Sequence, residues 1–398
     1  MIVRELVTLT LNGTDRDALR DDLAELEVEE HVDSADVFRL RFAVGLQSNR
    51  AWRHLDDPDL AVWNRLAIQA GYPGNRELLV DGFITHVNVM LSGSGAEDSY
   101  IELSGMDRSV AMDLDDKQVA WTNKKDSDIA QEIFSSYGLS WEVEDTELLH
   151  DERIATILQS ETDIRFLRRL AARNGFECFV RGNRGYFRTA NLEQPPQNPV
   201  TVPGGNATAL RFEVDGTPAT RLEIRRIDPF EKRADREALA ELPERPLARR
   251  TLATLRGDAR TARRLLRQQP AIATHELRAR LRAGYDGASG FAVASGEIDG
   301  RCYRGVLRSR RLVTIDGAGP THSGTYYVTR VRHHLQSDSY TQSFEARRNA
   351  VGVLGTEAFA APGRLTPIAP GGGAAPTGNR LLPPQQPGQP GSLTQGGS

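Results

Sequence analysis

The sequence predicts an α+β fold in which two related β units flank a smaller α/β segment and a Pro/Gly-rich tail follows. Three observations predict it. A strand–turn–strand pattern occurs twice, the hydrophobic period changes from about 2 to about 3.6 between the copies, and Pro, Gly and Gln dominate beyond residue 361. At 398 residues the chain is long enough for two or three domains with their own cores.

The composition is typical of a soluble globular protein, with 39% hydrophobic and 26% charged residues. No apolar run approaches the roughly 20 residues needed to cross a bilayer, and Met1–Leu6 leads directly into a strand without a signal-peptide core. We therefore expect no membrane-spanning segment and no secretory signal. The formal net charge of −4 gives no general reason to expect a polyanionic partner.

Each copy of the repeated pattern contains three strands. The strands of the first copy are 65–71, 83–87 and 99–103, and those of the second are 311–317, 327–331 and 339–344. Two copies of one unit suggest an internal duplication, which lets a ring of three subunits present six similar surfaces. The alternative is that short strand–turn–strand patterns resemble one another by chance.

The first β region, residues 1–118, begins with alternating strands at 6–10 and 37–44. In the second of these strands Phe38, Leu40 and Phe42 fall on one face, as expected for a half-buried strand. Residues 15–26 are predicted as a short helix or turn with a solvated acidic face.

The α/β segment, residues 119–200, is predicted to begin with a helix capped by Asp126 or Ser127 and ended by Gly138. Its apolar face contains Ile129, Ile133, Phe134 and Tyr137. A short strand at 139–143 follows.

A second helix is predicted from a capping box at Ser160–Asp163 to Asn174-Gly175. Its predicted inner face comprises Ile164, Leu167, Leu170 and Ala171, with Arg165, Arg168, Arg169 and Arg173 mainly on the other side. A hairpin of 176–180 and 185–188 completes the insertion. Cys178 alternates with Phe176 and Val180 on this hairpin, which indicates a small buried side chain.

The second β region, residues 201–352, contains predicted strands at 209–214 and 221–227 before the second copy of the pattern. Residues 229–246 are predicted as an exposed connector. Helices are expected at 260–268 and 274–283, separated by Pro270. The last segment, 353–398, cannot bury enough apolar surface to fold alone and is predicted to be a mobile tail.

The motifs of common catalytic and metal sites are missing from the sequence. It has no Walker loop and no Gly-x-Ser-x-Gly elbow, and His333 and His334 are adjacent, so a strand would point them to opposite faces. The acidic pairs Asp56-Asp57 and Asp115-Asp116 are interpreted as solvated turns. We therefore expect no catalytic, cofactor-binding or metal-binding residue, no cofactor and no enzyme activity.

Two segments carry a family resemblance. Glu161–Gly175 resembles the E-x-D-x-x-F-L-x-R-L-A-x-x-x-G signature of phage late control D and VgrG-type spike proteins. Gly319–Asn349 resembles the closing G-x-x-x-S-G-x-Y-x-V-x-x-V-x-H … Y-x-x-x-F-x-x-R-R pattern of the same family, and Asp107 matches its G-x-D. The three motifs occur in the expected order over most of 1–352.

The resemblance implies a baseplate hub of a contractile tail or a contractile injection system. Hubs of this family form a homotrimer in which two β-barrel domains per chain make a pseudo-sixfold ring. The ring joins a hexameric tail tube to a trimeric spike. The resemblance therefore implies two β-barrel-like tube domains here, assembly in the bacterial cytoplasm, and a place in a phage tail or in an injection particle. Tube protein, spike protein and other baseplate components are the expected partners.

The chain departs from VgrG proteins by ending in a Pro/Gly tail where they carry an OB-fold and a β-helical needle. We expect a separate spike chain, and the tail is hypothesised to engage the spike, cargo or tape-measure protein through Leu381-Leu382, the alternative being that it is an idle linker remnant. A tail-associated cell-wall hydrolase and a nucleic-acid-binding module built on Arg249–Arg282 are the rival functions. The first lacks an identifiable acidic or metal-bearing cleft, and the second lacks aromatic side chains that stack on bases.

Overall fold

The computed structural model describes residues 6–47, 51–72, 74–93, 98–153, 156–227, 234–239, 245–257, 263–265, 274–336, 338–355, 357 and 359. The tail beyond residue 360, including Leu381-Leu382, lies outside them, and so does the greater part of the expected connector. No helix among the described residues is both long and apolar enough to cross a membrane.

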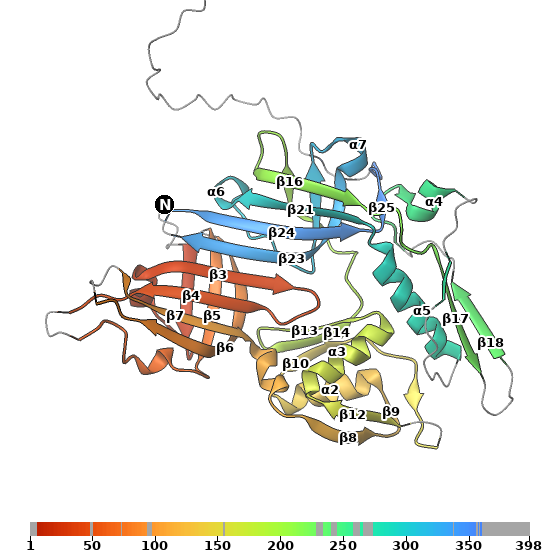
Figure 1. Cartoon of the computed structure of the whole chain (residues 1–398), viewed down its shortest axis with the longest axis horizontal. Coiled ribbons are helices and arrows are strands. Elements are labelled where there is room, and N and C mark those ends of the chain that lie inside the picture. Colours follow the sequence, from red (N-terminus) through yellow and green to blue (C-terminus); the bar gives the residue numbers. More distant parts are fainter. Residues whose placement is uncertain are drawn as a thin grey trace, which may run out of the picture. The chain divides into compact units, whose positions relative to one another are not determined.

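One large sheet dominates the described chain (Figure 1). Its strands in spatial order are β16 (Ala207–Val214), β21 (Ala292–Asp299), β24 (Tyr340–Arg348), β23 (Gly324–Gln336), β3 (Leu23–His31), β4 (Val37–Ala43), β7 (Tyr100–Asp107), β6 (Asn75–Met90), β5 (Arg65–Tyr72), β1 (Val7–Leu11) and β2 (Thr14–Asp15). β22 (Leu312–Asp316) pairs with β23 and with β15 (Gln197–Thr201). The first and second β regions therefore share a single sheet.

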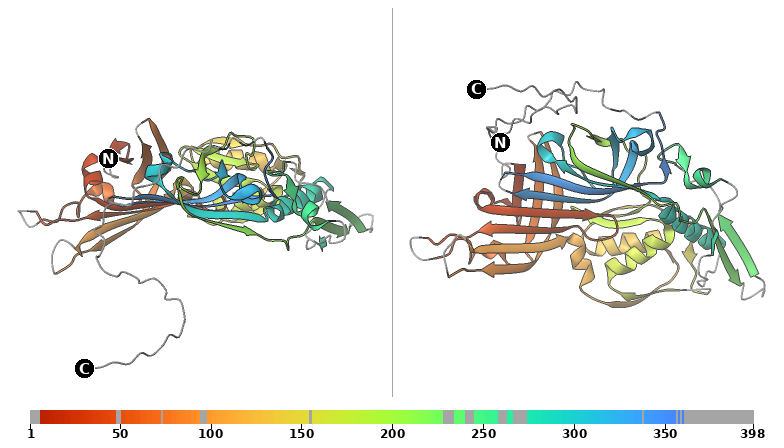
Figure 2. Two further views of the ribbon diagram at one scale, coloured as in Figure 1. Left: turned by 90° about the horizontal axis from the view of Figure 1, so that it is seen from above. Right: turned by 45° about the horizontal axis from the view of Figure 1, so that its top comes forward.

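Strand β3 of the first region pairs with β23 of the second, from His31 opposite Arg330 to Glu25 opposite Gln336. Figure 2 shows these red and blue strands side by side. The prediction of a helix or turn over 15–26 is right only for α1 (Asp17–Asp21), because β3 already begins at Leu23. The alternation of buried Leu26 and Val28 with outward glutamates gives β3 its two-residue period.

The two predicted three-strand copies are both antiparallel meanders, β5–β6–β7 and β22–β23–β24. Each has a bulge at a threonine in its middle strand, Thr85 in β6 and Thr329 in β23. The Thr85 hydroxyl donates to the Ser104 carbonyl at 3.3 Å, and the Thr329 hydroxyl donates to the Glu345 carbonyl at 3.1 Å. In each case the acceptor residue pairs with the residue that follows the bulged threonine.

Each β region has its own hydrophobic core. Strands of the first region contribute Leu9, Leu26, Phe38, Leu40, Phe42, Ile68, Ile84 and Leu103, among others. The second core includes Val200, Ala294, Ile298, Val313, Tyr326, Val331 and Phe344. Phe38, Leu40 and Phe42 share a buried face as predicted.

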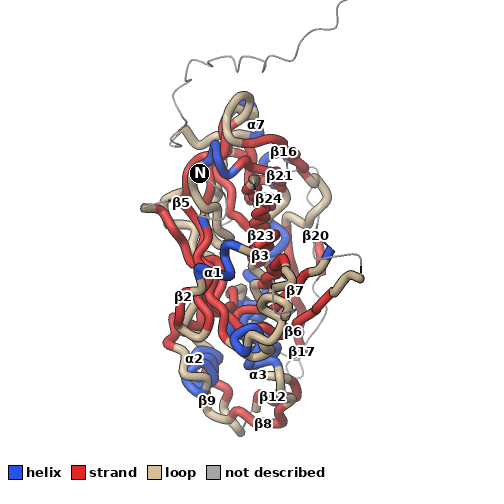
Figure 3. The backbone as a smooth tube through the Cα atoms, turned by 90° about the vertical axis from the view of Figure 1, so that its left-hand side faces the viewer, coloured by secondary structure: helices blue, strands red, loops and turns tan. Residues whose placement is uncertain are grey.

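The α/β insertion forms a third compact core. Its elements are η4 (Arg108–Asp113), β8 (Lys117–Trp121), β9 (Lys124–Lys125), α2 (Asp126–Ser136), β10 (Ser140–Val143), β11 (Leu149–His150), β12 (Ile157–Glu161), α3 (Asp163–Asn174), β13 (Glu177–Arg181) and β14 (Arg184–Arg188). The predicted inner faces of both helices pack into this core, with Tyr137 only partly buried, and Cys178 is buried on β13 with its thiol pKa raised to about 12 by burial. Figure 3 shows α2 and α3 at the end of the sheet opposite α7 (Gly319–His322).

Both predicted helix caps are displaced. Ser160 belongs to β12, where it pairs with Gln118, so Thr162 is the N-cap of α3. Lys125 is the N-cap of α2, and the Asp128 carboxylate accepts the Lys125 backbone N–H at 3.0 Å. Strand pairing occupies the residue expected to cap α3, whereas α2 begins at Asp126, so the residues expected to cap it are already helical. Gly138 and Gly175 do end the helices, with φ of 66° and 72°.

The region before α5 differs from prediction. β17 (Arg221–Ile227) is as expected, but β18 (Ala234–Leu239) pairs with it inside the supposed connector. Residues 263–265 form strand β20 against β17 in place of the expected helix, because the β17 edge offers partners to their backbone. The predicted helix at 274–283 is longer, as α5 (Thr274–Ser289).

The remaining short elements connect these parts. They are η2 (Pro58–Leu60), β19 (Arg250–Thr251), α4 (Leu252–Arg256), α6 (Gly300–Tyr303), α7 and β25 (Ala350–Val351).

Candidate functional site: a buried charge junction

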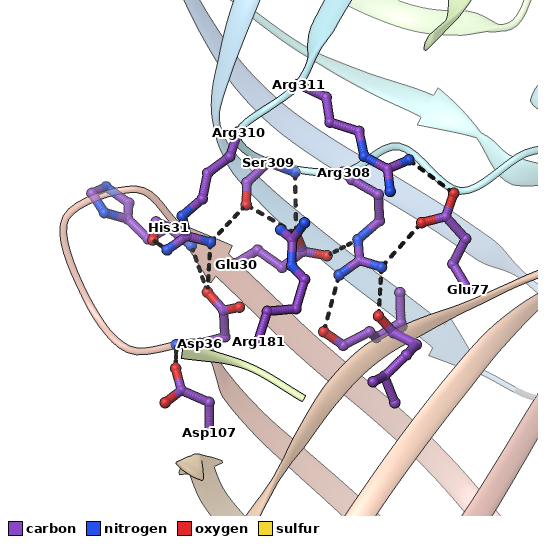
Figure 4. Close-up of polar contacts among 12 residues, drawn as sticks. Glu30, His31, Asp36, Glu77, Asp107, Arg181, Arg308, Ser309, Arg310 and Arg311 are labelled. Atoms are coloured by element: carbon purple, nitrogen blue, oxygen red, sulfur yellow. Dashed lines mark hydrogen bonds and ion pairs between the residues drawn. The ribbon is translucent and has the colours of Figure 1, made fainter. Parts of the chain in front are cut away.

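Charged side chains and one serine meet where the two β regions and the insertion come together (Figure 4). We call this set the charge junction. It comprises Glu30, Asp36, Glu77, Asp107, Arg181, Arg308, Ser309, Arg310 and Arg311. The arginines of the second region come from the loop before β22, whereas Arg181 ends β13 of the insertion. The acids lie on or beside β3, β6 and β7.

Glu30 is the central acid and is fully buried. It accepts from the Arg308 Nε at 2.6 Å and from the Ser309 N–H and hydroxyl at 3.1 and 2.9 Å. The His333 Nε2 and Arg181 Nη2 lie 3.4 and 3.6 Å away. Burial by itself would raise the pKa of Glu30, but the neighbouring Arg308 cation and the nearby His333 side chain hold it far below its usual value.

Arg308 links Glu30 to strand β6. Its Nη1 donates to Glu77 at 3.2 Å and to the Leu78 carbonyl, and its Nη2 donates to the Leu79 carbonyl at 3.2 Å. Arg311 holds the second Glu77 oxygen at 3.0 Å. All three nitrogens of the Arg308 guanidinium therefore have acceptors in the first region, which meets the condition for burying a charge.

Arg310 and two aspartates form the second half of the junction. The Arg310 Nη1 donates to Asp36 at 3.3 Å, and the Asp36 backbone N–H donates to the Asp107 carboxylate at 2.7 Å. The other Asp107 oxygen accepts the Ser109 N–H at 2.7 Å, so Asp107 caps η4, the first turn of the insertion. Burial, together with the Asp36 charge, raises the pKa of Asp107 to about 6.

This raised pKa predicts how stability changes with pH. The native state binds the Asp107 proton more tightly than the unfolded chain does, so its contribution is complete below pH 3.8 and is lost as the pH rises through 6. At 1.36 kcal/mol per pKa unit the loss is about 3 kcal/mol. Urea denaturation from pH 4 to 7 should show the wild type losing most of this stability relative to Asp107→Asn. A constant difference between the two proteins across that range would contradict the assignment.

Stacked side chains hold the insertion against the junction. The Arg310 guanidinium lies 4.1 Å from the centre of the Phe179 ring, and the Tyr186 ring stacks on Phe179 at 4.5 Å and 7°. Arg188 lies over Tyr186 at 5.5 Å. Cation–π contacts of this kind contribute about 0.5 to 2 kcal/mol each.

A buried hydrogen bond makes a further link between the insertion and β23. Tyr327 donates to Glu177 at 2.7 Å. Burial raises the pKa of both groups, so the tyrosine stays protonated as a donor.

The motif residues of the insertion are structural. Asp163 is buried and accepts from Gln159 and from the Tyr137 hydroxyl, both at 2.7 Å, and from Lys117. Glu161 pairs with Arg169 at 2.6 Å on the surface. Arg173, expected on the outer side, instead donates its Nε to buried Asp126 at 2.7 Å and joins the end of α3 to the start of α2.

The closing motif supports the second β region. His333 is fully buried, with its Nδ1 3.0 Å from the Tyr340 hydroxyl, while His334 lies on the opposite face as predicted. Arg348 is buried over the Tyr326 ring at 4.2 Å and donates to the Ser323 and Thr321 carbonyls at 3.0 and 2.6 Å.

Sequence reasoning found Asp107 and His333 but missed Glu30 and Arg308–Arg311. One signal was available: Glu30 continues the inward series of Leu26 and Val28, so a charge stands at a core position of a two-residue period. The described residues contain no group of three or more His, Cys, Asp or Glu side chains arranged to hold a metal ion.

The chain matches one family model and shares its fold with several solved structures. Residues 5–337 match the family model described as the Alg8 N-terminal domain. Among solved structures, the 43 kDa tail protein of prophage MuSo2 from Shewanella oneidensis has a TM-score of 0.63 at 11% identity, covering 87% of this chain and 99% of that one. No curated protein matches the chain in sequence.

Two further structures share the fold. A tail protein from Neisseria meningitidis has a TM-score of 0.58 at 12% identity, covering 87% of this chain and 97% of that one. An E. coli component of the type VI secretion system, itself similar to T4 tail proteins, has a TM-score of 0.51 at 12% identity, covering 82% of this chain and 73% of that one.

Proposed function

The chain belongs to the Alg8 N-terminal domain family, and from this premise we propose that it is the structural, non-catalytic hub of a contractile tail or injection-system baseplate. In this role it forms a homotrimer that joins the hexameric tail tube to the trimeric spike. The fold shared with tail proteins and with a type VI secretion component supports the proposal. Its work is symmetry matching, since two similar meanders per chain become six in a trimer.

The observation that carries the proposal is a run of antiparallel strands with an open edge at each end. The run comprises the eight strands from β16 to β6 in the sheet order. Among the described strands, β16 pairs only with β21, and Thr85–Met90 of β6 pair only with β7. Because eight strands alternate in direction, the end of one copy can pair antiparallel with the start of the next, which closes a ring when repeated.

Both open edges expose apolar side chains on the face of the sheet that carries the core. On the core side, Val87 and Val89 of β6 are 38% and 41% exposed although their partners on β7 are buried. The same side of β16 carries Phe212 and Val214, and Val214 is 42% exposed. Pairing these edges would cover apolar side chains that each subunit leaves exposed.

From the sequence we expect the contacts between barrels at the exposed edges of 79–89 and 326–334, but residues 326–334 of β23 are not an open edge. β23 pairs with β24 on one side and with β22 and then β3 on the other. Because β3 of the first β region pairs with this edge of β23, we place the second contact surface on the open edge of β16.

The ring is tested by the double substitution Val87→Asp/Val89→Asp. We expect the wild type to be trimeric with its tube partner, and the variant to be monomeric, since two carboxylates at the closing edge would be buried without partners. Leu158→Asp is the matched control, because Leu158 is 65% exposed on the insertion and should leave the trimer intact. Native mass measurement of each complex decides, and a monomeric wild type or a trimeric double variant would overturn the proposal.

A further inference from the structure

One face of the shared sheet carries a planar array of ion pairs, which we call the charge ladder. Its members are alternate residues of four adjacent strands: Arg330, Arg332 and His334 of β23, Glu25, Glu27 and Glu29 of β3, Arg39 and Arg41 of β4, and Glu102 of β7. The residues between them, such as Leu26 and Val28, belong to or face the core. The ladder therefore lies on the face turned away from both cores.

The acids of β3 stand between two rows of cations. Glu29 accepts both the Nε and the Nη2 of Arg330 at 2.8 Å. Glu27 is shared, accepting from Arg332 at 2.7 and 2.9 Å and from Arg39 at 2.8 Å.

The remaining acid of β3, Glu25, extends the array to β7. It contacts His334 at 2.8 Å and Arg41 at 3.7 Å. Arg41 also pairs with Glu102 at 2.8 Å. Every arginine of the ladder therefore has a carboxylate in the plane of the sheet.

The ladder is balanced in charge at neutral pH. It contains four carboxylates and four guanidinium groups. The His334 hydrogen bond lowers the pKa of Glu25, while at Glu27 burial opposes ionisation but the hydrogen bonds from Arg332 and Arg39 outweigh it and lower the pKa. Both acids are therefore ionised, and no member remains as an isolated charge.

Stability does not account for such an array. The arginine side chains of the ladder are 36% to 47% exposed, and ion pairs this exposed contribute little to stability because solvent screens them. What the pairing does change is the electrostatic potential of the face, because each charge has an opposite charge within contact distance.

We propose that the charge ladder is the wall of the hub channel and that its in-plane pairing lets a charged polypeptide pass without being held. The inference rests on the proposed ring: the covered face packs against β1, β5, β15 and β22, which leaves the ladder as the face free to line the channel. A wall of one sign would retain chains of the opposite charge and repel chains of its own.

Substitutions that unbalance the ladder in each direction test the inference. Glu27→Gln leaves Arg39 and Arg332 without their shared carboxylate, and Arg39→Gln/Arg332→Gln leaves Glu27 exposed to solvent without a cation. Glu193→Gln and Arg165→Gln/Arg169→Gln are the matched controls, because they make the same charge changes on exposed side chains away from the ladder. The probes are fluorescent poly-L-glutamate and poly-L-lysine, with anisotropy measured on the hub–tube complex at low salt.

The wild type should bind both probes weakly and about equally. Glu27→Gln should bind polyglutamate about tenfold more tightly and the double arginine variant polylysine about tenfold more tightly, with both effects lost at high salt. Trimeric ladder variants that bind no more tightly than their controls, or a wild type with a strong preference for one probe, would overturn the inference and leave the hub proposal standing. A monomeric wild type, seen in the mass of the same complex, would instead remove the hub proposal and the channel with it.

Discussion

Replacing Arg308 by methionine should lower the free energy of unfolding by about 3 to 5 kcal/mol, the usual cost of breaking a buried ion pair by removing one partner. Both Arg308 and Glu30 are buried, at 2% and 0% exposure, and their contact is 2.6 Å. Without the guanidinium, Glu30 keeps the Ser309 bonds but loses its main counter-charge. The carbonyls of Leu78 and Leu79 lose a donor as well.

Arg332→Met provides the matched control, since Arg332 has the same kind of bidentate pair with Glu27 but is 46% exposed. It should cost no more than about 1 kcal/mol. Equilibrium urea denaturation followed by circular dichroism measures both variants. Equal destabilisation by the two substitutions would contradict the importance of the junction.

Glu30→Gln separates charge from shape at the same position. The amide keeps the size of the side chain but removes the closest carboxylate of the buried Arg308 cation, so we expect a loss similar to that of Arg308→Met. A double variant of Glu30→Gln and Arg308→Met should lose less than the sum of the two, because each single substitution already removes the contact between these residues. Additive losses would indicate that the two residues act independently.

Leu167→Asp and Leu170→Asp should each unfold the α/β insertion. Both leucines are fully buried on the inner face of α3, and an unpaired carboxylate there costs several kcal/mol in addition to the lost apolar contacts. Thermal melts should show a lower midpoint, and limited proteolysis should cleave within 119–200 first.

Ala172→Asp on the exposed side of the same helix is the control. It changes the charge and the helix propensity without entering the core, so its effect should stay near 1 kcal/mol. Arg168→Asp should likewise be milder than either leucine variant. Melts in which all four variants match the wild type would contradict the packing of α3.

Short-range patterns account for what could be predicted. The meander strands, α2, α3 and their glycine ends follow from periods and stop signals within about 15 residues. The cap of α3 was misplaced because β12 includes Ser160, and residues 263–265 formed a strand because β17 offered an edge. At both places, pairing with a neighbouring strand outweighed the local preference for a helix cap or a helix.

The candidate site could be predicted only in part. Asp107 and His333 belong to recognisable motifs, whereas the loop of Arg308–Arg311 has no motif of its own. A charged residue at an inward position, as at Glu30, indicates a buried partner but does not identify it. The identity of that partner depends on which strands become neighbours.

By itself, the sequence determined the repeated β pattern, the helical insertion and the family resemblance, because each depends on residues close together in the chain. Only the tertiary structure decided that β3 joins β23 and makes one sheet of two β regions. Glu30 and Arg308 are 278 positions apart, and the ladder draws its residues from four strands that the sequence does not place side by side. Contacts of this range are selected by the packing of the whole sheet, because burying an ion pair is favourable only where both partners and their remaining hydrogen bonds are supplied together.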